Sequence, residues 1–181
     1  SGGSSVSLSA VWGAGGEVYA TGSGNPGVVF RYASGSWEAM ESGTAKPLNG
    51  VHGLNTGDVY AVGEDGSVVH YAGSSWSSLP RWNDSNFYGV WGSSPTDVFA
   101  VGWRASGAGG VVLHYDGTDW SEMTIPPYGT FNQLEGVWGS SSSQVFALGN
   151  KIYLYNGSGW TEQTEITPAQ VYAAWGSSPT N

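Results

Sequence analysis

The chain has no cysteine, only five lysine and arginine residues, and no long apolar segment. Without cysteine it forms neither disulfides nor thiolate metal sites, and cysteine usage gives no information on its compartment. The few basic residues leave a net charge of −9, which repels nucleic-acid phosphates and anionic membranes. No apolar run approaches the roughly 20 residues that span a bilayer. We therefore expect no nucleic-acid partner and no membrane insertion.

Glycine and aromatic residues are abundant instead. The 181 residues include 30 glycines, 10 tryptophans and 10 tyrosines, a composition typical of short strands joined by tight turns. The length suits one compact domain with a sizeable core. The opening segment Ser1–Ser5 has neither a basic nor an apolar region, so residues 1–7 are interpreted as a linker or a cloning remnant rather than a signal peptide.

One five-residue phrase recurs along the chain. It starts at five positions: Leu8, Leu48, Phe87, Leu134 and Val171. The spacing is close to the roughly 40 residues of a four-stranded propeller blade. This periodicity predicts propeller repeats over 8–181, divided as 8–47, 48–86, 87–133, 134–170 and a partial repeat at 171–181.

Each repeat contains segments that predict three further strands. A segment rich in β-branched and aromatic residues ends in glycine, as in Asp97–Gly102, and a third segment ends in a tyrosine. Five residues after that tyrosine stands a tryptophan, as in Tyr115 and Trp120. Both faces of the first three strands are largely apolar, so each sheet needs another sheet on either side. We predict an all-β fold, a complete or partial β-propeller of four-stranded antiparallel blades, with four complete repeats and the first strand of a fifth.

Two segments carry a resemblance to known propellers. Val90–Gly102 reads Val-Trp-Gly-Ser-Ser-Pro-Thr-Asp-Val-Phe-Ala-Val-Gly and resembles the repeats of bacterial secreted and surface propellers. His114–Trp120 resembles the Asp-box turn of sialidase-type propellers, but Asp116 and Trp120 are four residues apart where that family has a spacing of five. The other repeats replace the aspartate with Ala33, Ala72 or Asn156. The resemblance implies the fold and an extracellular or cell-surface location in a bacterium, and it implies no sialidase activity.

Variation between repeats is concentrated on one face of the predicted blades. With the strands of a repeat labelled a to d, this is the face of the b–c and d–a connections, and it carries Lys46, Arg81, Arg104 and Lys151. Loops held by a rigid scaffold commonly carry recognition, and aromatic rings with nearby polar groups suit a sugar or a peptide. The candidate ligand-binding residues are Arg81, Trp82, Asn83, Asp84, Trp103, Arg104 and Tyr128. The alternative is that both tryptophans fold over the blade ends and the arginines face solvent.

No residue pattern indicates catalysis or metal binding. His70 and His114 occupy the same repeat position, so they belong to different blades and do not form the cluster of ligands that zinc requires. We interpret them as partly buried, hydrogen-bonded side chains. Asp58 and Asp97 recur just before the second strand and are interpreted as turn caps, since calcium needs six or more oxygen ligands. No nucleophile-elbow phrase is present, and we predict no enzyme activity and no cofactor.

The sequence favours a non-catalytic binding module that recognises a glycan or a protein through the face of the b–c and d–a loops. The alternative is a purely structural or self-assembling propeller fragment, suggested by the near-uniform repeats and the incomplete fifth one. Unpaired strands at such a break recruit other chains. We therefore expect self-association through exposed edge strands.

Overall fold

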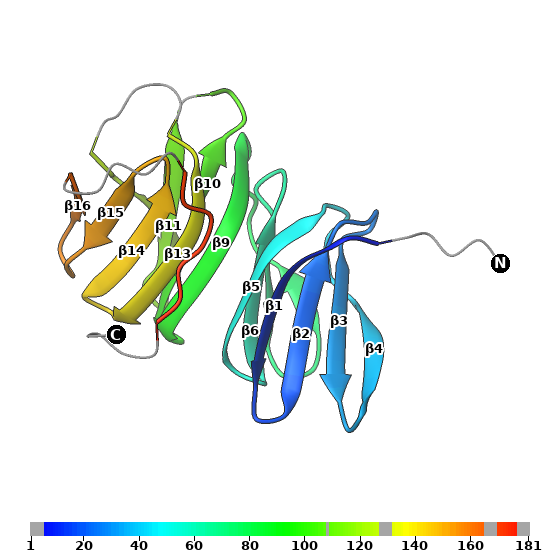
Figure 1. The fold of residues 1–181 in the computed structure, drawn as a ribbon. Helices are drawn as coiled ribbons and strands as arrows, with labels where there is room; N and C mark the ends of the chain where they lie inside the picture. Colours follow the sequence, from blue (N-terminus) through cyan, green and yellow to red (C-terminus); the bar gives the residue numbers. More distant parts are fainter. Residues whose placement is uncertain (1–5, 108, 127–131, 165–169, 177–181) are drawn as a thin grey trace. The chain divides into compact units, whose positions relative to one another are not determined.

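The computed structural model describes residues 6–107, 109–126, 132–164 and 170–176. These residues form sixteen β-strands in four antiparallel sheets, and none of them is helical (Figure 1). Accordingly, the described part contains no helix of the length and hydrophobicity needed to cross a membrane. The chain divides into a first unit, Ser1–Asn83, and a second unit, Asp84–Asn181, each with two sheets.

Each sheet contains four strands that pair in chain order, which confirms the predicted four-stranded antiparallel blade. In the first unit, blade 1 comprises β1 (Leu8–Ala14), β2 (Glu17–Gly22), β3 (Val28–Ala33) and β4 (Ser36–Glu41), and blade 2 comprises β5 (Leu48–Asn55), β6 (Asp58–Gly63), β7 (Val68–Tyr71) and β8 (Trp76–Ser78). In the second unit, blade 3 comprises β9 (Ser85–Ser94), β10 (Asp97–Arg104), β11 (Gly110–Tyr115) and β12 (Trp120–Met123), and blade 4 comprises β13 (Leu134–Ser141), β14 (Gln144–Gly149), β15 (Ile152–Tyr155) and β16 (Trp160–Glu162).

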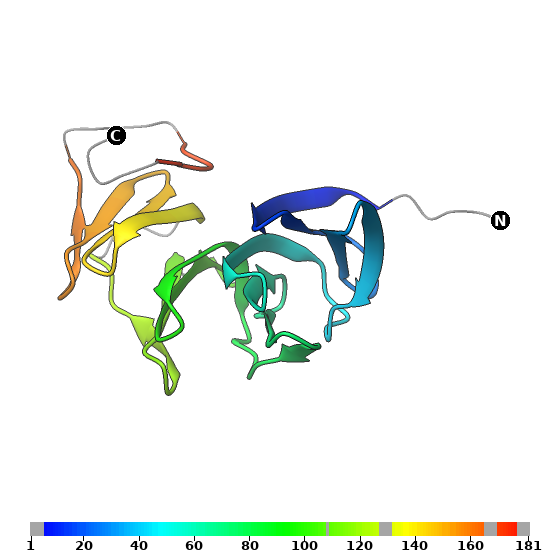
Figure 2. The same cartoon turned by 90° about the horizontal axis from the view of Figure 1, so that it is seen from below.

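Blades 1 and 2 of the first unit pack face to face (Figure 2). Tyr19 on β2 has no exposed surface. Its ring centroid lies 5.8 Å from that of Tyr71 and 6.3 Å from that of Trp76, both on blade 2. Trp12 on β1 covers Gly53 so closely that a Cβ at Gly53 would lie 2.4 Å from the indole ring. An aromatic side chain from each of the first two strands thus packs onto the next blade.

Blades 3 and 4 of the second unit pack in the same way. Phe99 on β10 is fully buried, with its ring centroid 5.5 Å from that of Tyr155 and 6.1 Å from that of Trp160. Trp91 on β9 covers Gly139, where a Cβ would lie 2.6 Å from the indole ring. The same repeat positions therefore build the same contact twice.

The two hydrophobic cores correspond position by position through the repeat. Buried residues of the first core are Tyr19, Val29, Leu48, Val59, Ala61, Val69, Tyr71 and Trp76. Their repeat equivalents in the second core are Phe99, Val112, Leu134, Val145, Ala147, Tyr153, Tyr155 and Trp160. Aliphatic and aromatic side chains recur on strands two residues apart, so a whole face of each sheet is removed from water by its neighbour.

The fifth copy of the repeated phrase, residues 171–175, lies where the first strand of a blade would lie but forms no strand pairing. The Val171 N–H donates to the Gly149 carbonyl at 2.9 Å. A Cβ at Gly136 would meet Tyr172 and Ala173, much as a Cβ at Gly89 would meet Gly136, the repeat equivalent of Ala173, and Val137. Residues 170–176 accordingly run along β13 (Figure 1). They are not assigned to a strand, because the described residues supply no second strand for them to pair with.

Candidate functional site

Residues 79–83, which follow β8 and end the first unit, are held in place by the b–c turn of blade 2. In that turn, Glu64–Gly66, φ is +53° at Asp65 and +67° at Gly66, the signs of a type I′ hairpin turn. The Trp82 N–H donates to the Gly66 carbonyl at 3.3 Å. A Cβ at Gly66 would lie 2.1 Å from the Trp82 carbonyl oxygen. Only glycine lets the two segments approach this closely, and their approach brings Arg81 within reach of Asp65.

Two cationic side chains share one carboxylate at this turn. Lys46 Nζ lies 3.1 Å from Asp65 Oδ2, and Arg81 Nη1 lies 3.0 Å from the same oxygen. The hydrogen bond and charge of Lys46, with the charge of Arg81, hold the pKa of Asp65 below its ordinary value. All three side chains are partly exposed. This Lys46–Asp65–Arg81 cluster carries one net positive charge on the surface of an acidic chain.

Trp82 and Asn83 follow the cluster directly in the chain. Trp82 is half-buried and Asn83 is exposed. Part of the indole is therefore accessible to a ligand, while its backbone is fixed on the turn of blade 2. Of the predicted ligand-binding residues in the first unit, Arg81 belongs to the cluster, and Trp82 and Asn83 follow it in the chain.

In the second unit, Asp84 holds the b–c loop of blade 3. Its Oδ1 accepts the Ser106 N–H at 2.8 Å, its Oδ2 accepts the Ser106 hydroxyl at 2.6 Å, and its carbonyl accepts the Ala105 N–H at 2.9 Å. Asp84 has a φ of +66°, a conformation that Asp tolerates better than most residues. Both carboxylate oxygens are used inside the protein, so the structure shows Asp84 as a loop anchor.

Trp103 and Arg104 end β10 on the same blade. The half-buried Trp103 donates its indole N–H to the Tyr88 hydroxyl at 3.2 Å. Arg104 forms an ion pair with Glu122 on β12, and this hydrogen bond raises the pKa of the Arg104 guanidinium. Arg81 and Arg104 are both in ion pairs and both remain partly exposed to solvent. Tyr128 lies outside the described residues, and ligand binding by the candidate residues stays a prediction.

A recurring pair of side chains links the second and third strands of three blades. The pairs are Glu17 with Arg31 at 2.9 Å, Asp58 with His70 at 2.7 Å, and Asp97 with His114 at 2.7 Å. In blade 4 the two positions hold the uncharged residues Gln144 and Leu154. The interpretation of Asp58 and Asp97 as turn caps misses this contact with the third strand: the strand register places each histidine diagonal to the aspartate on one sheet face, within reach of a side-chain pair. Asp97 also accepts a hydrogen bond from the Ser93 hydroxyl beside its own turn. The two histidines are half-buried and hydrogen-bonded, as predicted.

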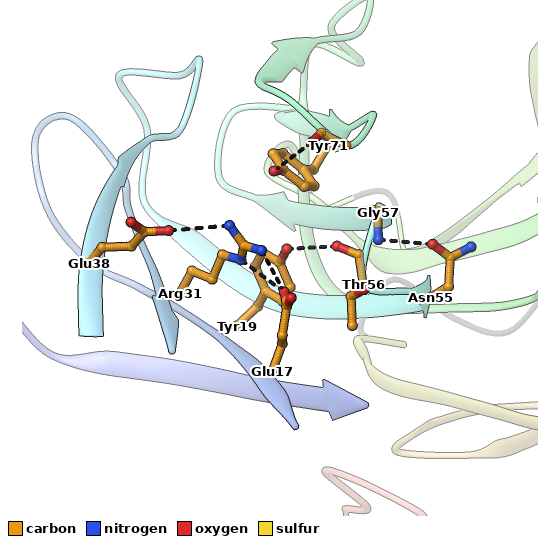
Figure 3. A network of polar contacts seen from close by, with 9 residues as sticks. Glu17, Tyr19, Arg31, Glu38, Asn55, Thr56, Gly57 and Tyr71 are labelled. Atoms are coloured by element: carbon orange, nitrogen blue, oxygen red, sulfur yellow. Dashed lines mark hydrogen bonds and ion pairs between the residues drawn. The ribbon is translucent and has the colours of Figure 1, made fainter. Parts of the chain in front are cut away.

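In blade 1 this pair is part of a larger polar network (Figure 3). Arg31 lies between Glu17 and Glu38, with 3.3 Å to the Glu38 carboxylate, and the hydrogen bond to Glu17 raises the Arg31 pKa. Next to it, the Tyr19 hydroxyl donates to the Thr56 carbonyl at 2.7 Å. Thr56 belongs to the a–b turn of blade 2, so this hydrogen bond joins the two blades of the first unit.

Tyr19 predicts a specific loss of stability at alkaline pH. Burial raises its pKa from 10.0 to about 12, so the folded state holds the phenol proton more tightly than the unfolded chain. This contribution to stability is complete below about pH 10 and is lost as the pH rises towards about 12. Tyr19→Phe should remove that part of the alkaline loss, and at neutral pH it should cost about 0.5–1.5 kcal/mol for the missing hydrogen bond. Urea denaturation between neutral pH and pH 11 measures both, and parallel pH profiles for the two proteins would contradict the assignment.

Among the described residues, no group of three or more histidine, aspartate or glutamate side chains is arranged to hold a metal ion. The acid–base pairs of blades 2 and 3 each supply one carboxylate and one imidazole, which is fewer than the three or four ligands of a zinc site. Their geometry is that of hydrogen-bonded pairs that join neighbouring strands.

No protein-family model and no characterised protein matches the chain in sequence. Solved structures match it in fold. "YCF48 bound to D1 peptide" superimposes with a TM-score of 0.55 at 11% identity, over 96% of this chain and 72% of that one. "YCF48 from Cyanidioschyzon merolae" superimposes with a TM-score of 0.53 at 13% identity, over 88% of this chain and 56% of that one. The chain thus spans a little over half the length of the second structure. At these identities the likeness shows the propeller fold alone.

Proposed function

We propose that this chain is a non-catalytic module that binds an acidic segment of another protein through the Lys46–Asp65–Arg81 cluster and Trp82. One observation carries the proposal: two cations converge on a single carboxylate oxygen at the surface of the first unit, in a chain whose net charge is −9. Mutual repulsion of the two cations is only partly compensated by Asp65. A carboxylate from a ligand would complete the compensation.

The chemistry of the cluster suits a peptide that carries Asp or Glu. Arginine and lysine N–H groups make their strongest hydrogen bonds with carboxylates, and the accessible part of Trp82 offers an aromatic surface for a side chain or a cation next to it. The cluster is fixed by the turn Glu64–Gly66 and by the backbone hydrogen bond from Trp82. A site that is already ordered loses less conformational entropy on binding.

A protein ligand is preferred to a glycan on two grounds. The cluster carries a net positive charge, and a carboxylate accepts a stronger hydrogen bond from Arg and Lys than a neutral sugar hydroxyl does. In addition, one protein of the same fold has been solved with a bound peptide, as its title states, although its 11% identity says nothing about the residues that bind here. The bacterial cell surface or exterior stays part of the proposal, on the resemblance of Val90–Gly102.

Binding of a glutamate-rich ten-residue peptide, measured by titration calorimetry, tests the proposal. The intact chain should bind it more tightly than an alanine-serine peptide of equal length, and affinity should fall as salt rises, because exposed charges are screened. Arg81→Ala should weaken binding about tenfold or more, in line with a charge-assisted hydrogen bond worth about 1.5–3 kcal/mol. Trp82→Ala should also weaken it.

Lys151→Ala is the matched control, because Lys151 is a b–c loop cation of the second unit, paired with Glu162 at 2.7 Å. It should leave peptide affinity unchanged. Equal weakening by Lys151→Ala and Arg81→Ala would show that only the overall charge matters and would contradict the site. Binding of neutral sugars on a glycan array, lost in Trp82→Ala but kept in Arg81→Ala, would favour the glycan ligand instead.

A further inference from the structure

Blade 1 has an apolar face that nothing covers in the described structure. This is the face turned away from Tyr19, on the side of β1 to β4 that does not contact blade 2. Val11 is 68% exposed and Trp37 is 54% exposed. Tyr32 lies beside them, with its ring centroid 5.5 Å from that of Trp37. Exposed aromatic and aliphatic side chains gathered on one sheet face mark an interaction surface.

The repeat shows what kind of surface covers these positions elsewhere. The equivalents of Tyr32 and Trp37 in blade 2 are Tyr71 and Trp76, which are buried against Tyr19 of blade 1. In blade 4 they are Tyr155 and Trp160, buried against Phe99 of blade 3. In both units, then, this face receives an aromatic side chain from the second strand of another blade. Blade 1 repeats the receiving residues, and among the described residues no blade covers them.

The first strand supplies a second matching feature. Gly53 and Gly139 lie under the indole rings of Trp12 and Trp91. The equivalent glycine of blade 1 is Gly13, which is exposed. The receiving face of blade 1 therefore has both the glycine that accepts a tryptophan and the Tyr–Trp pair that accepts an aromatic ring.

Blade 4 carries the complementary residues on the face turned away from blade 3. Trp138 and Phe146 stand at the repeat positions of Trp12 and Tyr19. Their ring centroids are 6.4 Å apart, against 6.3 Å for Trp12 and Tyr19. Phe146 is only half-buried, whereas Tyr19 and Phe99 at the same position have no exposed surface. Blade 4 thus presents the inserting half of the contact, preformed.

We propose that the outer face of blade 1 binds the outer face of blade 4 of a second copy of this chain, with the same contact that joins the two blades within each unit. Trp138 of one copy would cover Gly13 of the other, and Phe146 would pack on Tyr32 and Trp37. Each copy has one inserting and one receiving face, so the contact is head-to-tail rather than between identical surfaces. This inference rests on the fold and is independent of the proposed peptide binding.

A segment of the same chain competes with the second copy for its position on blade 4. Residues 171–175 hold the place beside β13 that β1 of the second copy would take. They are held there by the Val171 hydrogen bond to Gly149 and pair with no strand. A complete sheet brings more apolar surface to blade 4 than this single segment does, so β1 of the second copy would displace it.

Sedimentation equilibrium of the full 181-residue chain over a concentration series tests the proposal. The parent chain should associate reversibly. Val11→Glu, which places a carboxylate on the receiving face at an already exposed position, should weaken association at least about tenfold, since a carboxylate buried in the contact would be unpaired. Phe146→Glu should do the same from the inserting face. Thr118→Glu is the matched control: it adds the same charge to an exposed turn and should leave association unchanged.

Mixing the two variants distinguishes a head-to-tail contact from other modes of association. Val11→Glu keeps the inserting face and Phe146→Glu keeps the receiving face, so the mixture should form one-to-one heterodimers at concentrations where neither variant associates alone. Restored association also shows that both variants are folded. Val171→Pro, which removes the N–H that donates to Gly149, should tighten association about two- to tenfold.

Three results would overturn the proposal. The parent chain could remain monomeric at its highest soluble concentration. The two glutamate variants could associate as the parent does, which would place the contact at strand edges. The mixture could remain monomeric while each variant has the parent's far-ultraviolet circular dichroism, which would show that the two faces do not bind each other.

Discussion

Replacing Trp76 with alanine should destabilise the first unit by about 3–5 kcal/mol, whereas replacing Trp37 with alanine should cost less than about 1 kcal/mol. Both tryptophans lie at the beginning of the fourth strand of a blade, within its first two residues, and stand at the same repeat position. Trp76 is 7% exposed and packs on Tyr19 and Tyr71, while Trp37 is 54% exposed. The difference between the two substitutions therefore measures what a covering blade contributes. Urea denaturation followed by circular dichroism, at a protein concentration where the chain is monomeric, measures both.

The second unit contains the control for this prediction. Trp160 occupies the same position in blade 4, is 6% exposed and packs on Phe99. Trp160→Ala should be as costly as Trp76→Ala. Similar losses for Trp37→Ala and Trp76→Ala would mean that the tryptophan contributes mainly within its own blade, through its neighbouring tyrosine, and that packing between blades is a minor term.

Valine at Gly53 or at Gly139 should destabilise the unit that contains it by about 1–3 kcal/mol, the usual cost of an overpacked core. The reason is steric. A Cβ at either glycine would lie within 2.6 Å of a tryptophan ring from the neighbouring blade, so the ring or the sheet that carries it must shift. Thermal and urea unfolding of each variant provides the measurement.

Gly159→Val is the matched control in the second unit. No heavy atom lies within 4 Å of the position that a Cβ would take there, so the substitution should change the free energy of unfolding by no more than about 0.5 kcal/mol. If Gly139→Val were as mild as Gly159→Val, Trp91 would not cover Gly139 and the blades would not be in contact at this point.

The strands and their grouping into blades could be predicted from the sequence, because residue types that recur in every repeat indicate positions that pack in the same way within each blade. A tyrosine followed five residues later by a tryptophan recurs in four repeats, at Tyr32, Tyr71, Tyr115 and Tyr155, and positions that recur in type occupy the same place within their own blade. What the repeat could not show is which copies lack a neighbour. Tyr71 is buried while Tyr32 is half-exposed, although their local sequences are alike, because burial depends on the next blade.

The acid–base pairs between the second and third strands could have been predicted and were not. The position of Asp58 and Asp97 at the start of a strand predicts that each caps its own turn, since aspartate side chains bond turn backbone amides. A comparison of the two positions across repeats contains the signal. Wherever the first position is acidic the second is Arg or His, and in blade 4, where the first is Gln144, the second is Leu154. Side chains that change together between repeats are in contact.

The candidate site was predicted only in part because its partners come from other segments. Arg81 stood out as a rare cation next to Trp82, but its ion pair with Asp65 depends on the close approach of two backbone segments at Gly66. That approach has no signature in the sequence around Arg81. Asp84 illustrates the opposite case, since a residue with ligand-binding chemistry is used internally to hold Ser106.

If the same repeat positions join the two blades of each unit, nuclear Overhauser spectra should show it. We expect cross-peaks from the Gly53 Hα protons to the Trp12 indole ring and from the Gly139 Hα protons to the Trp91 indole ring, with both glycines shifted upfield by the ring above them. Cross-peaks in one unit only, or in neither, would contradict it.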